Sequence, residues 1–290
     1  MNTEKIEFRQ VRDFGDIINA TFAFISQNFR KLFLCILFIG GPFALLTSIS
    51  LTFFQSSNIQ AAKGNFTSEY FLMFGIYMFL FTVALVAVSA AVYYFIALYM
   101  EYDDFEISDV WLRVRKEIPV LVLFFFGYMI VVIFATFCLF IPGIYVSIAG
   151  ALLFIVRLVE RKGFFDCLSR SFKLISGHWW LTFGLLFVIT IIQTLITYVS
   201  VAPLYILGYV FSLLDLGTIF MGLDASPLAI AIQAIQSIIG IICSVIIIVA
   251  LIFHYFSLVE KKEGGGLMAK IRTMGTQPKT TSREEEEEEY

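Results

Sequence analysis

The chain has 290 residues, of which 59% are hydrophobic and 15% are charged. Soluble domains usually carry about 25% charged residues, and the apolar residues here lie in runs too long for a globular core. The composition therefore excludes an ordinary soluble domain and indicates a protein surrounded by lipid. The formal net charge of -3 says nothing about partners, because the acidic run 284–289 near the C-terminus supplies it. We expect no nucleic-acid partner.

Six apolar runs are candidates for membrane spans, at about residues 32–54, 70–100, 118–141, 144–159, 179–201 and 228–257. A bilayer core about 30 Å thick requires roughly 20 apolar residues in a helix. Only Pro142 and Gly143 separate the third run from the fourth, which predicts a tight helical hairpin. We expect Pro203 to end the fifth helix and 204–214 to form a short interfacial or re-entrant piece. The sequence thus predicts an all-α polytopic membrane protein with six transmembrane helices.

Lys and Arg residues set the orientation of the spans, because short loops rich in them stay in the cytoplasm. With six spans, Lys63 is alone on one side, and the other basic residues, out of 20 in the chain, all fall on the opposite side. Models with five or seven spans would scatter them. We therefore predict that both termini are cytoplasmic and that anionic lipids of the cytoplasmic leaflet are partners.

Amphipathic stretches precede the odd-numbered spans. Residues 13–29 and 163–178 place apolar side chains at helical spacing on one face, and 107–117 is a shorter version. Such stretches are typical of helices that lie in the membrane interface. We expect interfacial helices before spans one, three and five. Their expected anchors, with those of the adjoining aromatic belt, are Phe14, Phe22, Phe164, Phe172, Trp179 and Trp180.

The first and third amphipathic stretches are similar when shifted by 150 residues. The matching pairs are Phe14/Phe164, Asp16/Asp166, Phe22/Phe172, Ile25/Ile175, Ser26/Ser176 and Phe33/Phe183. We therefore predict one membrane domain over 1–258, built from three parallel units at about 13–100, 105–160 and 163–258. The tail 259–290 has no apolar periodicity, which predicts disorder in the cytoplasm. Its acidic end is either a natural docking segment or an added tag.

Ionisable residues are scarce in the spans, where placing a charged side chain at the bilayer centre costs a free energy of about 2.5–3.5 kcal/mol. Gln193, Gln233 and Gln236 have two interpretations: they line a polar path between the last two spans, or they hydrogen-bond neighbouring helices. We favour helix packing. The four cysteines are scattered, and the acidic cluster near residues 101–106 lacks the spacing of an EF-hand loop. We predict no metal, no cofactor and no catalytic site.

Residues 142–183 carry a more specific pattern. A Pro-Gly-Ile-Tyr turn leads into a span, and then S-x-x-[FW]-x-L-x-x-G-x-x-W follows at Ser169, Phe172, Leu174, Gly177 and Trp180. This stretch resembles the membrane domain attached to some glycerophosphodiester phosphodiesterases. It also resembles related stand-alone six-helix bacterial inner-membrane proteins of unknown function. The catalytic barrel of those enzymes is absent here, with its His and acidic metal ligands, so the resemblance implies no enzymatic activity.

What the resemblance does imply is a bacterial inner-membrane location and a helical domain that anchors, scaffolds or handles lipid. Two functions follow as expectations. The first is a non-catalytic scaffold or assembly component of an inner-membrane complex, with other membrane proteins as partners. The alternative is a lipid or small-amphiphile transporter whose interfacial helices act as gates.

Overall fold

The computed structural model describes residues 5–62, 67–102, 104–212 and 227–264, and the regular structure in these ranges is helical. The helices are α1 (Phe14–Ala62), α2 (Ser68–Glu101), α3 (Ile107–Cys138), α4 (Phe140–Ala149), a 3₁₀ turn (Gly150–Leu152), α5 (Leu153–Glu160), α6 (Phe164–Ile175), α7 (Trp179–Ser212) and α9 (Pro227–Glu263). Six stretches in them are long and apolar enough to cross a membrane; α4, the 3₁₀ turn and α5 together form the fourth. The expected all-α polytopic fold is confirmed.

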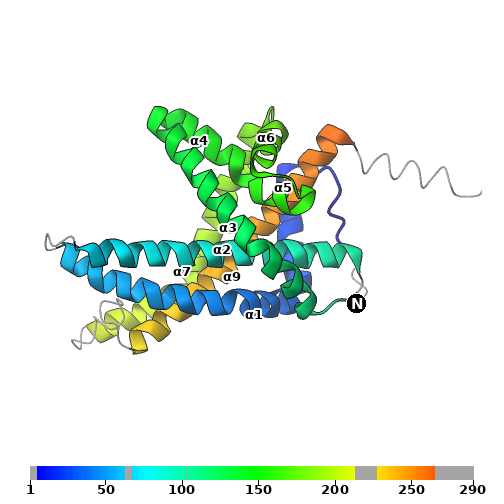
Figure 1. The fold of residues 1–290 in the computed structure, drawn as a ribbon. Coiled ribbons are helices and arrows are strands. Elements are labelled where there is room, and N and C mark those ends of the chain that lie inside the picture. Colours follow the sequence, from blue (N-terminus) through cyan, green and yellow to red (C-terminus); the bar gives the residue numbers. More distant parts are fainter. Residues whose placement is uncertain (1–4, 63–66, 103, 213–226, 265–290) are drawn as a thin grey trace, which may run out of the picture.

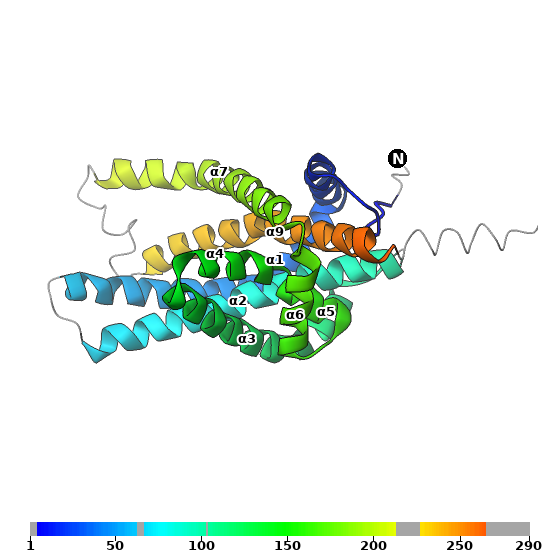
Figure 2. The ribbon, with the colours of Figure 1, turned by 90° about the horizontal axis from the view of Figure 1, so that it is seen from above.

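Three of the spans form a packed bundle. α1, α2 and α9 lie side by side over much of their length, and α7 packs against α9 and then diverges from it towards Ser212 (Figure 2). α3 and α4 form a hairpin that leans away from the bundle (Figure 1). Two glycines allow the close contact within this hairpin. A Cβ on Gly143 would lie 2.9 Å from Thr136 Cα, and one on Gly150 would lie 2.1 Å from the Tyr128 ring.

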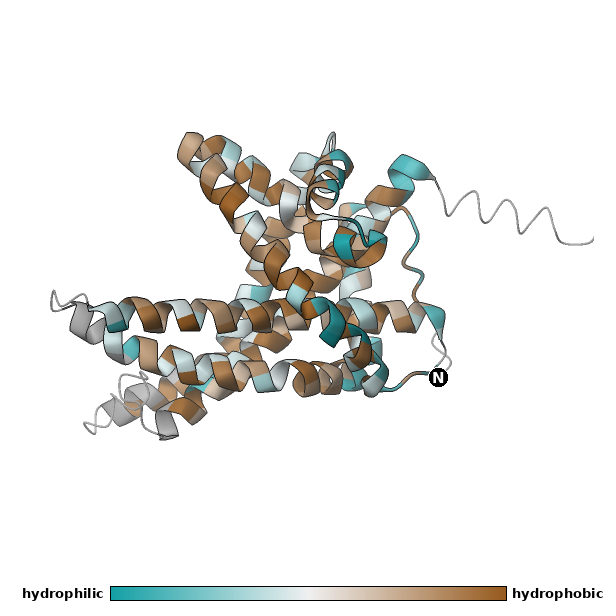
Figure 3. Ribbon diagram, viewed as in Figure 1, coloured by the Kyte–Doolittle hydropathy of each residue, from teal (hydrophilic) through white to brown (hydrophobic). Residues whose placement is uncertain are grey.

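The described chain begins and ends on the same side of the molecule, at residues 5 and 264 (Figure 1). We call this side the terminal end. Figure 3 shows that the hydrophilic residues gather there, whereas the long helices are hydrophobic along most of their length. Lys63, the one basic residue expected on the other side, lies outside the described residues.

The amphipathic stretches differ from one another in the structure. Residues 13–29 are not a separate helix: they open α1, and this first part stands at a steep angle to the rest of that helix (Figure 1). Residues 107–117 likewise open α3. Only 163–178 yields its own helix, α6, because the chain leaves helical geometry at Ser176, where ψ is 127°. It then turns through Gly177, whose φ of 81° is a left-handed conformation that glycine tolerates at low cost.

Proline and turn positions also depart from expectation. Pro203 does not end the fifth helix, since α7 continues to Ser212; a transmembrane helix tolerates proline because neighbouring groups satisfy the freed backbone. The third and fourth spans turn at Leu139, which is extended with φ -160° and ψ 139°. Pro142 lies in the first turn of α4, where its missing N–H costs no helical hydrogen bond. At the other end, α9 runs to Glu263, so the first residues of the expected tail are helical.

Candidate functional site

Polar side chains inside the spans connect α1 to α9. Gln233 Nε2 donates to Gln55 Oε1 at 3.2 Å, and Ser48 Oγ donates to Ser237 Oγ at 2.9 Å. Gln233 is buried, with 6% of its surface exposed. Gln193 on α7 and Gln236 on α9 are half-buried, and neither side chain forms a hydrogen bond within the described ranges. The structure thus places Gln233 between the first and last spans rather than between the last two.

The expected interfacial anchors fall into two groups. Trp180 (77% exposed) and Phe22 (36% exposed) point out of the protein. Phe14 and Phe164 instead pack against the core. Trp179 stacks on Tyr145 at 5.8 Å between ring centroids, and the Phe172 ring lies 6.0 Å from the same tyrosine.

α6 presents its apolar face to the protein. Cys167, Leu174 and Ile175 are fully buried there, and burial raises the pKa of the Cys167 thiol. On the outer face, Phe165 is 79% exposed. Sequence periodicity identified the amphipathic face of this helix but did not distinguish burial in protein from burial in lipid.

An ionic network at the terminal end holds α5, α6 and α9 together. Glu160 accepts hydrogen bonds from Lys162 at 2.6 Å, Arg170 at 2.8 Å and the Tyr255 hydroxyl at 3.2 Å. Arg170 also reaches Glu263 at 2.5 Å. Burial alone would lower the pKa of Arg170, but the hydrogen bonds and charges of these two glutamates raise it above its usual value.

Two further ion pairs connect α3 to α5 and the loop before α3 to α1. Arg157 of α5 pairs with Glu117 of α3 at 3.2 Å, and both side chains are largely buried. Lys31 of α1 pairs with Asp104 at 2.7 Å, where the Asp104 side chain is 94% exposed. The hydrogen bond from Lys31 lowers the pKa of Asp104. An exposed pair of this kind contributes little to stability, whereas a largely buried pair constrains the helices that carry it.

The segment that precedes α1, Lys5–Asp13, fills a space at the terminal end; we call it the N-terminal segment. Phe8 is 1% exposed and stacks on Phe253 of α9 at 4.3 Å. The Arg12 amide donates to Ser257 Oγ at 3.0 Å, and Ser257 Oγ donates back to the Arg12 carbonyl at 3.1 Å. Burial lowers the pKa of Arg12. Sequence analysis missed this docking, although Ile6 and Phe8 alternate with charged residues.

His254 of α9 is fully buried. Its Nε2 lies 2.8 Å from Thr182 Oγ1, which also donates to the His178 carbonyl at 3.1 Å. The Nδ1 atoms of both histidines are buried without a partner in the described ranges. Among the described residues, no three His, Cys, Asp or Glu side chains gather into a group that would bind a metal. Asp103 of the acidic cluster lies outside those residues.

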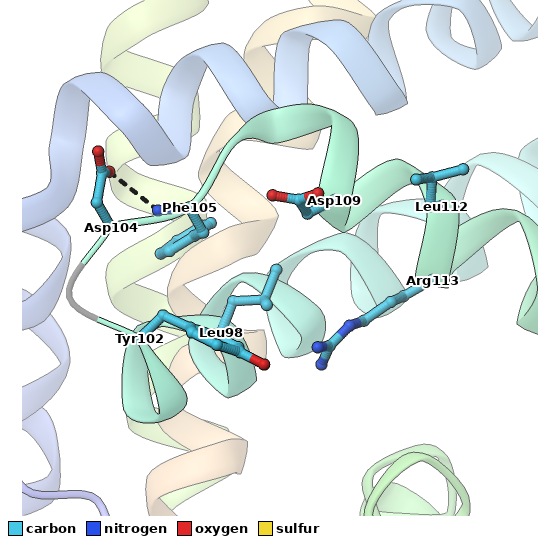
Figure 4. A pocket seen from close by; sticks show the side chains of 7 residues that line it. All are labelled: Leu98, Tyr102, Asp104, Phe105, Asp109, Leu112 and Arg113. Atoms are coloured by element: carbon cyan, nitrogen blue, oxygen red, sulfur yellow. Dashed lines mark hydrogen bonds between the residues drawn. The ribbon is translucent and has the colours of Figure 1, made fainter.

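Two cavities open at the terminal end. The smaller, about 350 Å³, is lined by seven residues between α2 and the start of α3 (Figure 4). Its carboxylates serve the local backbone: Asp104 accepts from the Phe105 amide at 2.9 Å, and Asp109 accepts from the Glu106 amide at 3.0 Å. The larger, about 630 Å³, lies between the N-terminal segment and the ends of α2, α5 and α9. We call it the terminal cavity.

No protein-family model, curated protein or solved structure matches this chain. The resemblance of residues 142–183 to a membrane-domain family therefore stays a prediction.

The Gln233–Gln55 contact generates a first prediction. The double-mutant cycle of Gln233→Leu and Gln55→Leu should give a coupling energy of about 0.6 kcal/mol, the average for hydrogen bonds between transmembrane helices. Reversible unfolding in detergent micelles measures it. Gln193→Leu is the matched control, because that side chain forms no hydrogen bond with the described part of the chain. A coupling indistinguishable from zero would contradict a packing role for Gln233.

The ionic network at the terminal end generates a second prediction. Glu160→Gln removes the charge that Arg170 and Lys162 share and should lower the free energy of unfolding by about 1–3 kcal/mol. We expect the low end of that range, because Arg170 keeps Glu263. Hydrogen exchange should accelerate across α6, as measured by mass spectrometry. Asp104→Asn, in the exposed pair with Lys31, serves as the control and should leave exchange in α6 unchanged. Equal protection in the two variants would refute the docking role of Glu160.

Proposed function

We propose that this chain is a non-catalytic integral membrane protein that acts as a scaffold or assembly component of a membrane complex. The proposal places it in the inner membrane of a bacterium, with both termini in the cytoplasm. Support for that orientation comes from the hydrophilic residues around the terminal end, since basic residues favour the cytoplasmic side.

The uneven packing of the spans carries the scaffold proposal. The most apolar window of the first span is 44% buried within the protein, compared with 11% for the third span and 17% for the fifth. At the tip of the α3–α4 hairpin, Phe137 is 88% exposed and Ile141 is 79% exposed. Near its base, the Arg157–Glu117 pair joins α3 to α5, which continues the second arm of the hairpin. α3 therefore offers a long apolar face to another membrane protein, and the tip of the hairpin extends that face onto the start of α4.

Site-specific photocrosslinking tests the scaffold role. A photoreactive residue in place of Phe137 or Ile141 should yield an adduct of one discrete protein mass in native membranes. The same residue in place of Leu152, which is fully buried, is the control and should yield none. The adduct partner should also co-purify with the unmodified chain. Crosslinks to lipid alone at both exposed positions would overturn the proposal.

An apolar groove favours a second candidate, a lipid or small-amphiphile transporter. The groove lies between α1, α7 and α9 and has a volume of about 160 Å³. Its lining includes Phe29, Phe33, Ile196 and Ile246. An apolar cavity of about 150 Å³ stays dry and admits a benzene-sized molecule. The groove is therefore large enough for part of an acyl chain, and the first part of α1, which bends beside it, is placed to act as a gate.

Reconstituted vesicles separate this candidate from the scaffold. If the chain moves lipid, fluorescent lipid should cross the bilayer faster in its presence, and Ile196→Trp, which fills the groove, should abolish the acceleration. Gln193→Leu or Gln236→Leu should also slow the movement if these residues line the path. Unchanged rates in both glutamine variants would remove them from it, and no acceleration by the unmodified chain would end the transporter hypothesis.

A further inference from the structure

The terminal cavity has the size and the place of a ligand site. Its volume of about 630 Å³ falls within the range of about 300–1,000 Å³ that is typical of small-molecule sites. Its walls come from the N-terminal segment and from the ends of α2, α5 and α9. Because three of the spans end here, the cavity lies where lipid headgroups meet the protein.

Tyr93 provides an unused polar group in this cavity. The residue is 9% exposed and lines the cavity, yet its hydroxyl forms no hydrogen bond with any residue that the structure describes. Although the ring is buried, the hydroxyl oxygen itself is accessible, so a ligand in the cavity can reach it. Arg161 and Arg113 lie within electrostatic reach of this hydroxyl, and so does Glu101, which pairs with Arg113. The two arginines outnumber this carboxylate, which favours an anionic acceptor for the hydroxyl proton.

The charges that line the cavity also favour an anion. Lys5 and Arg9 line it, and Arg9 is exposed and forms no ion pair with the described residues. The two carboxylates in the lining have arginine neighbours: Glu101 pairs with Arg113 at 3.4 Å, and Glu7 lies within electrostatic reach of Arg12. The lining thus holds two basic and two acidic side chains, but Glu101 is already paired with a cation outside the lining, so its charge opposes an incoming anion less.

The remaining lining is apolar. Ala97, Met100, Val159 and Phe256 contribute side chains from three helices. A site that combines basic and apolar side chains matches a molecule that carries a phosphate on an apolar body. In a membrane, the abundant molecules of that kind are phospholipids.

We propose that the terminal cavity binds the phosphate headgroup of an anionic membrane lipid. The Tyr93 hydroxyl, Lys5 and Arg9 contact the phosphate, while Val159 and Phe256 contact the glycerol and the first methylene groups. This site goes beyond the scaffold role and does not depend on it, because it uses none of the exposed faces of α3, α4 or α7.

The N-terminal segment makes this site conditional on its own docking. It supplies Lys5 and Arg9, and it is anchored by the Phe8–Phe253 stack and by Ser257. Loss of the anchor removes one wall of the cavity together with both basic groups. Phe8→Ala should therefore weaken lipid binding although Phe8 is not expected to contact the phosphate.

The test uses the full chain in nanodiscs of phosphatidylcholine that contain a small fraction of phosphatidylglycerol. Native mass spectrometry counts the retained phosphatidylglycerol as that fraction is varied. Tyr93→Phe should weaken retention about tenfold, the effect of losing one hydrogen bond to a charged group. Tyr94→Phe is the matched control, because Tyr94 is also buried on α2 but is not among the residues that line the cavity; its retention should equal that of the unmodified chain.

Two further arms complete the experiment. Inorganic phosphate that displaces the lipid would show that the phosphate group alone is recognised, whereas retention of the lipid in its presence would assign the whole headgroup. Thermal unfolding of each variant checks that the chain stays folded. Equal retention by the Tyr93→Phe and Tyr94→Phe variants, or equal retention of phosphatidylcholine and phosphatidylglycerol by the unmodified chain, would overturn the proposal.

Discussion

The directional contacts at the terminal end are the constraint on which the arrangement of this protein depends. Lipid tails are as apolar as leucine, so two apolar helices gain little hydrophobic free energy by leaving lipid for each other. At the terminal end, however, polar and charged groups form hydrogen bonds and ion pairs with fixed geometry. The Glu160–Arg170–Glu263 network joins three helices there. The Phe8–Phe253 stack adds the N-terminal segment to the same region.

Which spans pack together and which diverge follows from these contacts. α1 and α9 are joined at the terminal end through the N-terminal segment and again within the span through Gln55 and Gln233, and they pack closely over much of their length. The α3–α4 hairpin has a buried ion pair near its base, Arg157–Glu117, and its tip stands away from the bundle (Figure 1). α1 and α9, which have directional contacts at two levels, are thus held side by side, whereas the ion pair of the hairpin joins its two arms only near the base and leaves the tip free to diverge.

The sequence predicted the six spans well because a span is a local property. Bilayer thickness demands a fixed length of apolar helix, and each helix satisfies its own backbone. Contacts between distant residues leave no such local signal. The docking of Phe8 against Phe253 and the contact of His254 with Thr182 join residues far apart in the chain. Local expectations also failed where one backbone position decides the outcome, as at Pro203 and Leu139.

The predicted repeat shows how one turn changes the architecture of a unit. α1 begins at Phe14 and α6 begins at Phe164, so the two helices start at positions that the 150-residue shift makes equivalent. Each has its aspartate in the first turn, where a carboxylate offsets the helix dipole. The chain then leaves helical geometry at Ser176 and turns through Gly177 in the left-handed conformation, whereas the equivalent residues, Ser26 and Gln27, continue the helix. The same amphipathic pattern therefore yields a separate helix in one unit and a bent extension of a span in the other.

The terminal cavity lies among the contacts that hold the terminal end together. Its walls belong to the N-terminal segment and to the ends of α2, α5 and α9, which the terminal-end contacts hold together. A ligand that binds only the assembled walls stabilises that assembly by mass action. A lipid bound there would thus reinforce the contacts that fix the spans, while the outward faces of α3 and α7 stay open to other membrane proteins. Binding of lipid at the terminal end and assembly through the hairpin are therefore compatible roles on separate surfaces of one chain.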